Sequence, residues 1–349
     1  CFRVDLSDIR DELLPPPNFE FKTFLEVNDS PGHLGCIIPI ACRKAGLVPH
    51  LRAIKSIFSG TIPQELQRIL HEPSALCQVG VLNAPPKDID CLSAPYKICL
   101  TYWESDKCSP EWVDGLNKFD EVWVISEFNR QVLVDSGVTK PVHKIRVGVD
   151  RNEYFFCPYR RPEYVFGMAG RLAYRKGVDI AARAFRRAFP SESDVRLEIK
   201  TRVNNIAVAV HNMTELGDTR IKVINEEWEV PQLRQWYGSL NVYVGPTRCE
   251  GLGLCFLEAA ACGATPIVTD WSGCQEFLRE PFISLPTSGK MAAVGVVCGQ
   301  WAVPDEDALV ELMRMCYNER VDRGQQCSDY VLREWPVENV AEDIGRLIG

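Results

Sequence analysis

The sequence predicts an α/β protein with two Rossmann-like, doubly wound domains that face a cleft. The chain has 349 residues, which is more than one hydrophobic core usually serves. Short apolar segments alternate with helix-like segments, and this alternation runs twice along the chain. Such alternation is typical of parallel sheets that helices cover on both faces.

The order of the expected elements follows from this alternation. In the first half we expect strands at residues 21–27, 49–54, 77–83, 96–102, 121–126 and 144–149, and helices at 35–45, 63–70, 110–117 and 127–136. In the second half we expect strands at 164–169, 196–201, 220–225, 241–246 and 265–270. The helix after Lys176 has the clearest pattern, because its apolar residues keep the spacing of one buried stripe. The stripe consists of Val178, Ala181, Ala182, Phe185, Ala188 and Phe189.

The two runs of alternating segments predict two domains, a linker between them and a closing helix. Residues 155–162, which contain two prolines, read as the linker between the halves. We therefore expect an N-terminal domain over 1–157 and a C-terminal domain over 158–332. A closing helix within 333–349 is expected to pack back toward the N-terminal domain.

Composition and charge argue against several kinds of partner. Lys and Arg number 39 and Asp and Glu 47, a formal net charge of −8, so nothing global favours nucleic acid. The 15 cysteines are scattered, without the Cys-x-x-Cys spacing of a zinc site. We expect reduced core thiols in a cytoplasmic protein, no metal site, no signal peptide and no membrane span.

The first informative turn covers residues 170–177 (GRLAYRKG), directly after an expected strand. Ligands of open α/β sheets bind beyond the carboxyl ends of the strands. Gly170 permits a tight turn there, and Arg171 and Lys176 supply cations of the kind that bind a diphosphate. The alternative is a solvated basic turn.

The second turn lies within residues 246–263 (PTRCEGLGLCFLEAAACG), and Gly263 is the expected end of its helix. Backbone N–H groups at Gly251 and Gly253 can approach a ligand closely. Glu250 precedes the helix and can reach sugar hydroxyls. Glu258 lies within an apolar helix, where an unpaired carboxylate is costly, so a ribose diol is a suitable partner.

This turn also imitates a dinucleotide-binding fingerprint. Asp270 follows the next strand, as that fingerprint requires. However, Phe256 stands where the fingerprint has a third small residue, which argues against a nicotinamide cofactor.

The two motifs together resemble those of the retaining GT-B glycosyltransferases of family 4. The resemblance rests on Gly-Arg-x(4)-Lys-Gly at 170–177 and Glu-Gly-x-Gly-x(4)-Glu-Ala at 250–259. It extends to 268–276 (VTDWSGCQE), 335–340, 120–130 (DEVWVISEFNR) and 148–150, and so to nearly the whole chain. It implies the GT-B fold and a nucleotide-diphosphate-sugar as donor substrate, with no separate cofactor.

The resemblance also implies roles for single residues. Arg171 and Lys176 would hold the donor diphosphate, Glu250 would contact the transferred sugar, and Glu258 would bind the ribose. Backbone N–H groups would contribute from Gly251, Leu252, Gly253 and Leu254. The nucleobase is expected near 201–202 and 223–225.

The N-terminal half departs further from the family. Its first loop reads NDSPGHLG at 28–35; we expect Gly32 to approach the donor phosphates and His33 to face the cleft, unless His33 is a surface residue. Glu104 is a candidate for orienting the acceptor hydroxyl, with a structural ion pair as the alternative. The expected catalytic residues are thus Glu250, Glu104 and His33.

The activity expected from these parts is metal-independent sugar transfer to a hydroxyl of a glycan, a lipid-linked molecule or a small molecule. The family resemblance implies that the anomeric configuration is retained. A sugar-nucleotide epimerase and a non-catalytic nucleotide-sugar-binding protein are the alternatives. Peripheral contact with the inner membrane face is conceivable, because Cys36, Ile37, Ile38 and Ile40 precede two cations. Core packing is the other interpretation of these apolar residues.

Overall fold

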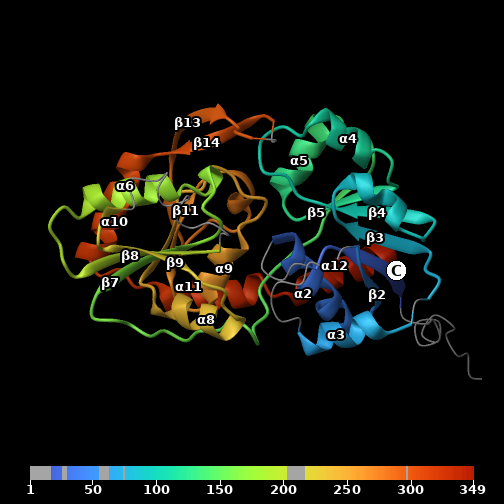
Figure 1. The fold of residues 1–349 in the computed structure, drawn as a ribbon, viewed down its shortest axis with the longest axis horizontal. Coiled ribbons are helices and arrows are strands. Elements are labelled where there is room, and N and C mark those ends of the chain that lie inside the picture. The colour runs from blue at the N-terminus through green and yellow to red at the C-terminus, as the bar shows by residue number, and fades with distance from the viewer. Residues whose placement is uncertain (1–16, 26–29, 55–62, 74, 203–216, 296–297) are drawn as a thin grey trace, which may run out of the picture.

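A computed structural model describes residues 17–25, 30–54, 63–73, 75–202, 217–295 and 298–349, with the side chains of 30–32 left out. Two lobes lie side by side (Figure 1). Each lobe is built around a six-stranded sheet in which every pair of neighbours is parallel. The predicted fold class is confirmed.

The N-terminal sheet has the strand order β2-β1-β3-β4-β5-β6. Its strands are β1 (Asn18–Thr23), β2 (Val48–Ala53), β3 (Val79–Asn83), β4 (Tyr96–Leu100), β5 (Glu121–Val124) and β6 (Val142–Lys144). Its helices are α2 (Ser30–Lys44), α3 (Gln64–His71), α4 (Pro110–Leu116) and α5 (Glu127–Asp135), with a 3-10 turn at Pro86–Cys91.

The C-terminal sheet has the order β12-β11-β10-β7-β8-β9. Its strands are β7 (Tyr164–Ala169), β8 (Val195–Thr201), β9 (Ile221–Asn225), β10 (Val242–Gly245), β11 (Thr265–Thr269) and β12 (Ile283–Leu285). Helices α6 (Val178–Ala188) and α10 (Glu306–Asn318) pack together, and α9 (Leu254–Ala261) packs against α8 (Val230–Ser239) and α11 (Gly324–Glu334). Turns of 3-10 helix lie at Tyr174–Lys176 and Ser272–Glu276.

The expected strand at 144–149 is wrong in its position. Strand β6 ends at Lys144, and Val149 makes only an isolated bridge with Pro336. The reason is close packing against the returning chain, because a Cβ on Gly148 would lie 2.1 Å from the carbonyl oxygen of Trp335. This segment is a crossing point of the two lobes rather than a sheet strand.

An antiparallel hairpin, which the sequence analysis did not predict, reaches from the C-terminal lobe to the other lobe. It consists of β13 (Thr287–Ala292) and β14 (Gln300–Pro304) and lies at the top of Figure 1. Lys290 forms an ion pair with Asp106 at 3.1 Å, and the amide of Gln300 donates to the Asp106 carboxylate at 2.6 Å.

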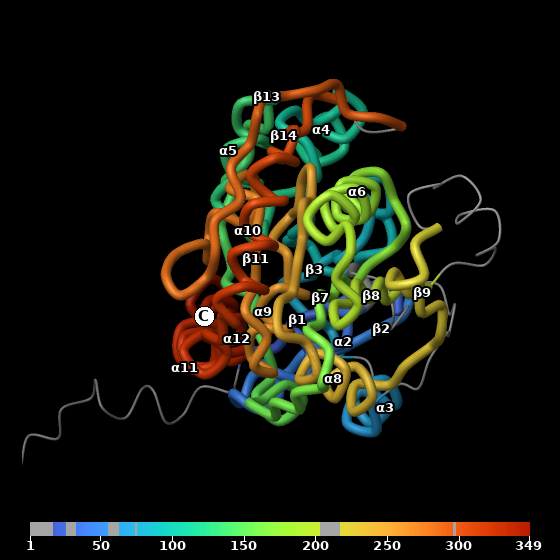
Figure 2. Tube along the Cα trace, turned by 90° about the vertical axis from the view of Figure 1, so that its left-hand side faces the viewer, coloured from blue at the N-terminus to red at the C-terminus, as the bar shows by residue number. Residues whose placement is uncertain are grey.

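The last helix, α12 (Glu338–Ile348), packs against α2. It is drawn in red among the blue elements of the N-terminal lobe in Figure 1, and Figure 2 shows it beside α11. Arg146 fixes it, because its Nε and Nη2 donate to both oxygens of Asp343 at 2.9 and 3.0 Å. Two lobes and one crossing helix therefore position the site.

The core accounts for most of the described cysteines. Of the fourteen described, all carry free thiols and ten are buried. Cys36 and Ile38 of α2 belong to this core, with 4% and 0% exposure. Within the described ranges, no helix combines the length and the apolar character that crossing a bilayer requires.

We expect Asp343→Asn to lower the free energy of unfolding by about 2 kcal/mol at pH 7, because it removes charge-assisted hydrogen bonds to Arg146. The Arg146 guanidinium outweighs the effect of burial and lowers the pKa of Asp343. The folded state thus releases this proton more easily than the unfolded state, and the stabilisation is lost as pH falls below about 4. Denaturant titrations from pH 7 down to pH 3 should therefore show the two proteins converging in acid.

The matched control is Glu342→Gln, since Glu342 also reaches Arg146 but its side chain is 66% exposed. Its free energy of unfolding should change by less than about 0.5 kcal/mol. An equal effect of both substitutions would contradict the role given to Asp343.

Candidate active site

A cavity of about 590 Å³ lies between the lobes, at the carboxyl ends of the strands of the C-terminal six-stranded sheet. It brings together nearly all of the predicted site residues. Those that line it are His33, Glu104, Arg171, Lys176, Glu250, Gly251, Leu252, Gly253, Leu254 and Glu258. Gly32 lies in the first turn of α2, and its predicted contact with the donor phosphates stays a prediction.

The central feature of the site is a buried ion cluster around Glu250. Lys176 Nζ lies 2.7 and 2.9 Å from the two carboxylate oxygens of Glu250, and Arg175 Nη1 lies 3.1 Å from Oε2. The Thr247 hydroxyl donates to Oε1 at 3.0 Å. Burial favours the protonated acid, but the two cations outweigh it and lower the pKa of Glu250 to about 2.

Gly177 allows the two turns that build this cluster to touch. Its φ is +72°, and a Cβ there would lie 1.9 Å from the carbonyl oxygen of Pro246. No residue with a side chain fits such an approach. The turn after β7 is thereby pressed against the turn after β10, where the Arg248 amide also donates to the Arg175 carbonyl at 2.7 Å.

Arg175 is the site residue that the sequence analysis missed. It lies within the 170–177 turn, whose other two cations received roles. Its Nη2 lies 2.8 Å from Glu104 Oε1, so one guanidinium joins Glu250 in one lobe to Glu104 in the other. Of the two interpretations of Glu104, the ion pair is the one observed, although Glu104 also lines the cavity.

A second buried carboxylate, Glu258 of α9, also lines the cavity. Tyr237 donates to its Oε2 at 3.1 Å, and His33 Nε2 is 3.7 Å from its Oε1. Burial raises the pKa of Glu258 to about 7, although the Tyr237 hydroxyl opposes this. Burial lowers the pKa of His33, against the attraction of Glu153.

His33 is not in a loop, as the sequence analysis expected, but in the first turn of α2, which begins at Ser30. Proline at position 31 is compatible with this, because the first turn of a helix has no backbone acceptor for the missing N–H. The alternative of a surface residue is also wrong, since the His33 side chain is 25% exposed and borders the cavity. Residues 28 and 29 lie outside the described residues.

The apolar residues of α2 face inward. Cys36 and Ile38 are buried, and Ile37 and Ile40 are part of the cavity lining. The interpretation as core and cleft packing therefore accounts for all four side chains, and none of them remains for a membrane-facing stripe.

The nucleobase region also differs in detail from its prediction. Thr201 and Arg202 line the cavity as expected, and Lys200 joins them. From the next connection the lining residues are those at 226–230 rather than those at 223–225. Strand β9 ends at Asn225, where the prediction also ended it, so the residues that line the cavity follow the strand rather than belong to it.

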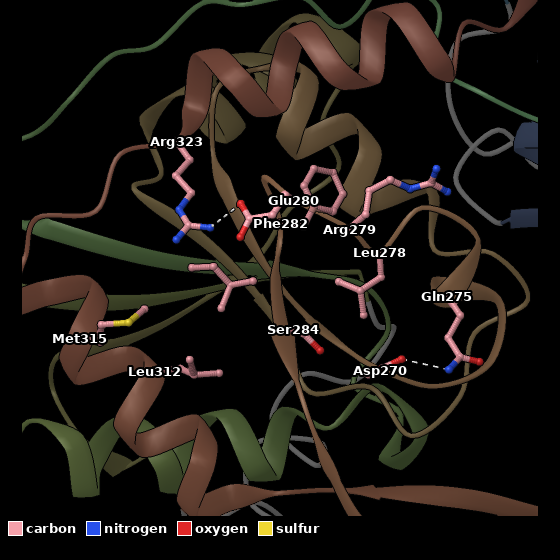
Figure 3. A pocket seen from close by; sticks show the side chains of 11 residues that line it. Asp270, Gln275, Leu278, Arg279, Glu280, Phe282, Ser284, Leu312, Met315 and Arg323 are labelled. Carbon is pink, nitrogen blue, oxygen red and sulfur yellow. Dashed lines mark hydrogen bonds and ion pairs between the residues drawn. The ribbon is translucent and has the colours of Figure 1, made fainter.

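A second cavity, of about 630 Å³, lies beside the edge strand β12 (Figure 3). Asp270 lines it and accepts from Gln275 at 2.9 Å. None of the predicted site residues lines this second cavity. The acid of the apparent dinucleotide fingerprint thus points to a different cavity, which contradicts that interpretation.

The described residues contain no group of three or more His, Cys, Asp or Glu side chains that could hold a metal ion.

Part of the chain resembles known proteins in sequence. Residues 163–317 match the family described as Glycosyl transferases group 1. Over 114 residues the chain is 32% identical to the lipopolysaccharide core biosynthesis mannosyltransferase LpcC of Rhizobium leguminosarum bv. viciae, covering 31% of each protein. It is 30% identical over 111 residues to mannosyltransferase LpsB of Rhizobium meliloti (strain 1021), covering 30% of each. The chain thus spans about a third of the length of these curated relatives.

Solved structures resemble the whole chain in fold. A sucrose-phosphate synthase from Thermosynechococcus elongatus superposes with a TM-score of 0.72 at 14% identity, over 95% of this chain and 98% of that one. Anabaena HepE in complex with UDP-glucose gives 0.68 at 13% identity, over 95% and 98%. The fold is GT-B, and residues 163–317 match the group 1 glycosyltransferases.

We expect Glu258→Gln to be more stable than the parent at pH 8 and no more stable at pH 5. The folded-state pKa of Glu258, about 7, lies above the ordinary value of 4.5, so the folded state binds this proton more tightly than the unfolded state. Stability therefore falls as pH rises from 4.5 through 7, and glutamine avoids that loss. Thermal melts across this range measure it.

Glu311→Gln, an exposed change on α10, is the control and should show no such pH dependence. A Glu258→Gln protein whose melting temperature parallels that of the parent at every pH would contradict the assignment.

Proposed function

We propose that this protein is a retaining, metal-independent glycosyltransferase that moves a sugar from a nucleotide-diphosphate-sugar to an acceptor hydroxyl. The observation that carries the proposal is the cluster of Lys176, Arg175 and Glu250 in the cavity that Arg171 and Glu258 also line. Cations at the carboxyl ends of strands are suited to a diphosphate leaving group.

The donor fits the cavity in one direction. Its sugar lies at Glu250 and the start of α9, its diphosphate at Lys176 and Arg171, and its ribose at Glu258. Glu258 accepts hydrogen bonds from the ribose diol in its ionised form, which the pKa of about 7 makes available near neutral pH. His33 lies beside Glu258 and belongs with the donor side rather than with the acceptor.

The reaction needs no protein nucleophile in this proposal. The bond from the anomeric carbon to the diphosphate oxygen breaks while the acceptor oxygen bonds to the same face of that carbon. The acceptor proton passes to an oxygen of the departing diphosphate, whose charge Lys176 and Arg171 stabilise. Glu250 and Glu104 are both held by cations, which supports this route over a covalent intermediate.

The acceptor side is formed by Glu104 and Tyr102, which line the cavity from the N-terminal lobe. Its class stays a prediction, namely a hydroxyl of a glycan, a lipid-linked molecule or a small molecule. The mannosyltransferase names of the two curated relatives make mannose the first sugar to test.

The function is tested with the purified chain, a panel of nucleotide-diphosphate sugars, and acceptors of the three classes, with and without EDTA. We expect acceptor-dependent release of nucleoside diphosphate at an unchanged rate in EDTA, and NMR should show the anomeric configuration retained. Conversion of the donor alone to an epimer, binding without turnover, or a trapped sugar–enzyme adduct would each contradict part of the proposal.

We expect Lys176→Gln to lower kcat/KM for the donor about 100-fold or more, because it removes a preorganised charge from the leaving group. Arg186→Gln, which changes an exposed cation on α6, should leave the rate within about twofold. Both variants should be folded by circular dichroism. Turnover of Lys176→Gln within threefold of the parent would remove Lys176 from the proposed site.

A further inference from the structure

The cavity extends beyond the diphosphate site to an end with a different chemistry. Here the lining comes from Lys200, Thr201 and Arg202 at the end of β8, and from residues 226–230 after β9. The inference below rests on the proposed function, since it concerns the nucleobase of the same donor.

The sheet order sets the distance between the two ends. Strands run β10-β7-β8-β9 across the sheet, and Glu250 follows β10 whereas Glu226 follows β9. At about 4.8 Å per strand spacing, three spacings separate them by roughly 14 Å. A nucleoside joined through a diphosphate to a sugar at Glu250 therefore places its base near β8 and β9.

Thr201 is the first sign that a polar group of a ligand belongs here. The residue is 2% exposed and borders the cavity. In the described part of the chain its hydroxyl has no hydrogen-bond partner. A buried hydroxyl without a partner is costly, so a ligand acceptor or donor at this position would remove that cost.

Glu226 is the second sign, because this exposed residue lines the same end of the cavity and its carboxylate is hydrogen-bonded there. Trp228 Nε1 donates to the Oε2 of Glu226 at 2.7 Å, and the backbone carbonyl of Glu226 accepts from Lys200 Nζ. The Lys200 ammonium in turn lies 4.7 Å from the centre of the Trp228 ring. Among the described residues no hydrogen bond occupies the other carboxylate oxygen, which can accept from a ligand.

The neighbouring acids have other tasks. Glu227 forms an ion pair with Arg202 at 3.4 Å, and Glu229 caps the start of α8 together with Gln232. Glu226 is therefore the acid of this group that suits base recognition best.

Only one common nucleobase presents the edge that a carboxylate requires. Guanine offers two adjacent donors, N1–H and the 2-amino group, with the acceptor O6 beside them. Uracil offers one N–H between two carbonyl oxygens, and adenine offers an acceptor nitrogen beside its amino group. A carboxylate would repel those acceptor atoms, because it accepts hydrogen bonds and donates none.

We propose that the donor of this enzyme carries guanine, with the Glu226 carboxylate accepting from N1–H and the 2-amino group and the Thr201 hydroxyl donating to O6. The apolar residues Val230 and Leu233 of α8 and Ile37 and Ile40 of α2, which line the cavity from the two lobes, pack against the faces of the base.

The test measures dissociation constants of the full chain for GDP, IDP, UDP and ADP by isothermal titration calorimetry. IDP differs from GDP only by the missing 2-amino group. We expect GDP to bind about tenfold or more tightly than each of the other three, since a charge-assisted hydrogen bond is lost or replaced by repulsion.

UDP or ADP binding as tightly as GDP would overturn the guanine assignment and leave the proposed function intact. Absence of binding by all four nucleotides would overturn the proposed function as well. The two failures are thus distinguishable.

Variants assign the contacts. Glu226→Gln should reduce the preference for GDP over IDP to within about threefold, whereas Thr201→Val should weaken GDP and IDP equally, about tenfold, because both contain O6. Glu227→Gln is the matched control and should keep the parent preference. A preference that survives Glu226→Gln, or that is lost with Glu227→Gln, would overturn the assignment to Glu226; unchanged circular dichroism establishes that each variant is folded.

Discussion

The ion cluster of Glu250, Lys176 and Arg175 is the constraint on which the site depends. Three charges are taken out of water there, and such a cluster persists only when each charge keeps its partners. The partners come from two turns that Gly177 lets approach to van der Waals contact. Removing one cation would leave Glu250 partly unpaired in a buried place, so the geometry of the cluster and the fold of the two turns require each other.

The same cluster relates the two lobes, because Arg175 also pairs with Glu104. It acts together with two other bridges, namely the β13–β14 hairpin with Lys290 on Asp106 and helix α12 with Asp343 on Arg146. The hairpin lies at the top of Figure 1, whereas the helix lies lower, among the elements of the N-terminal lobe. In the proposed binding mode a diphosphate would share Lys176 with Glu250 and lie next to the Arg175–Glu104 pair, so donor binding would involve charges that also join the two lobes.

The sequence predicted the fold and most of the residues that line one cavity, because both are encoded locally. Glycines and cations at strand ends identify the 170–177 and 250–258 turns whatever the rest of the chain does. What it could not predict depends on distant partners. The pairing of Arg175 with Glu104 joins residues 71 positions apart, and β13 has an exposed, polar pattern without strand alternation. The start of α2 was misplaced because Pro31 and Gly32 suggest a loop, although both are tolerated in a first helical turn.

The two ends of the cavity carry different charged groups, and in the proposed binding mode this gives the donor a direction. Cations line both ends, Arg171 and Lys176 at one and Lys200 and Arg202 at the other, but Arg202 pairs with Glu227 and Lys200 Nζ donates to the carbonyl of Glu226. At the other end Glu226 repels phosphate and accepts from N–H groups. A nucleotide-sugar placed backwards would bring its phosphates nearer to that carboxylate and leave Thr201 without a partner. In the proposed binding mode the orientation of the donor thus depends on Glu226 and Thr201 at one end and on Arg171 and Lys176 at the other, before any contact with the sugar distinguishes one hexose from another.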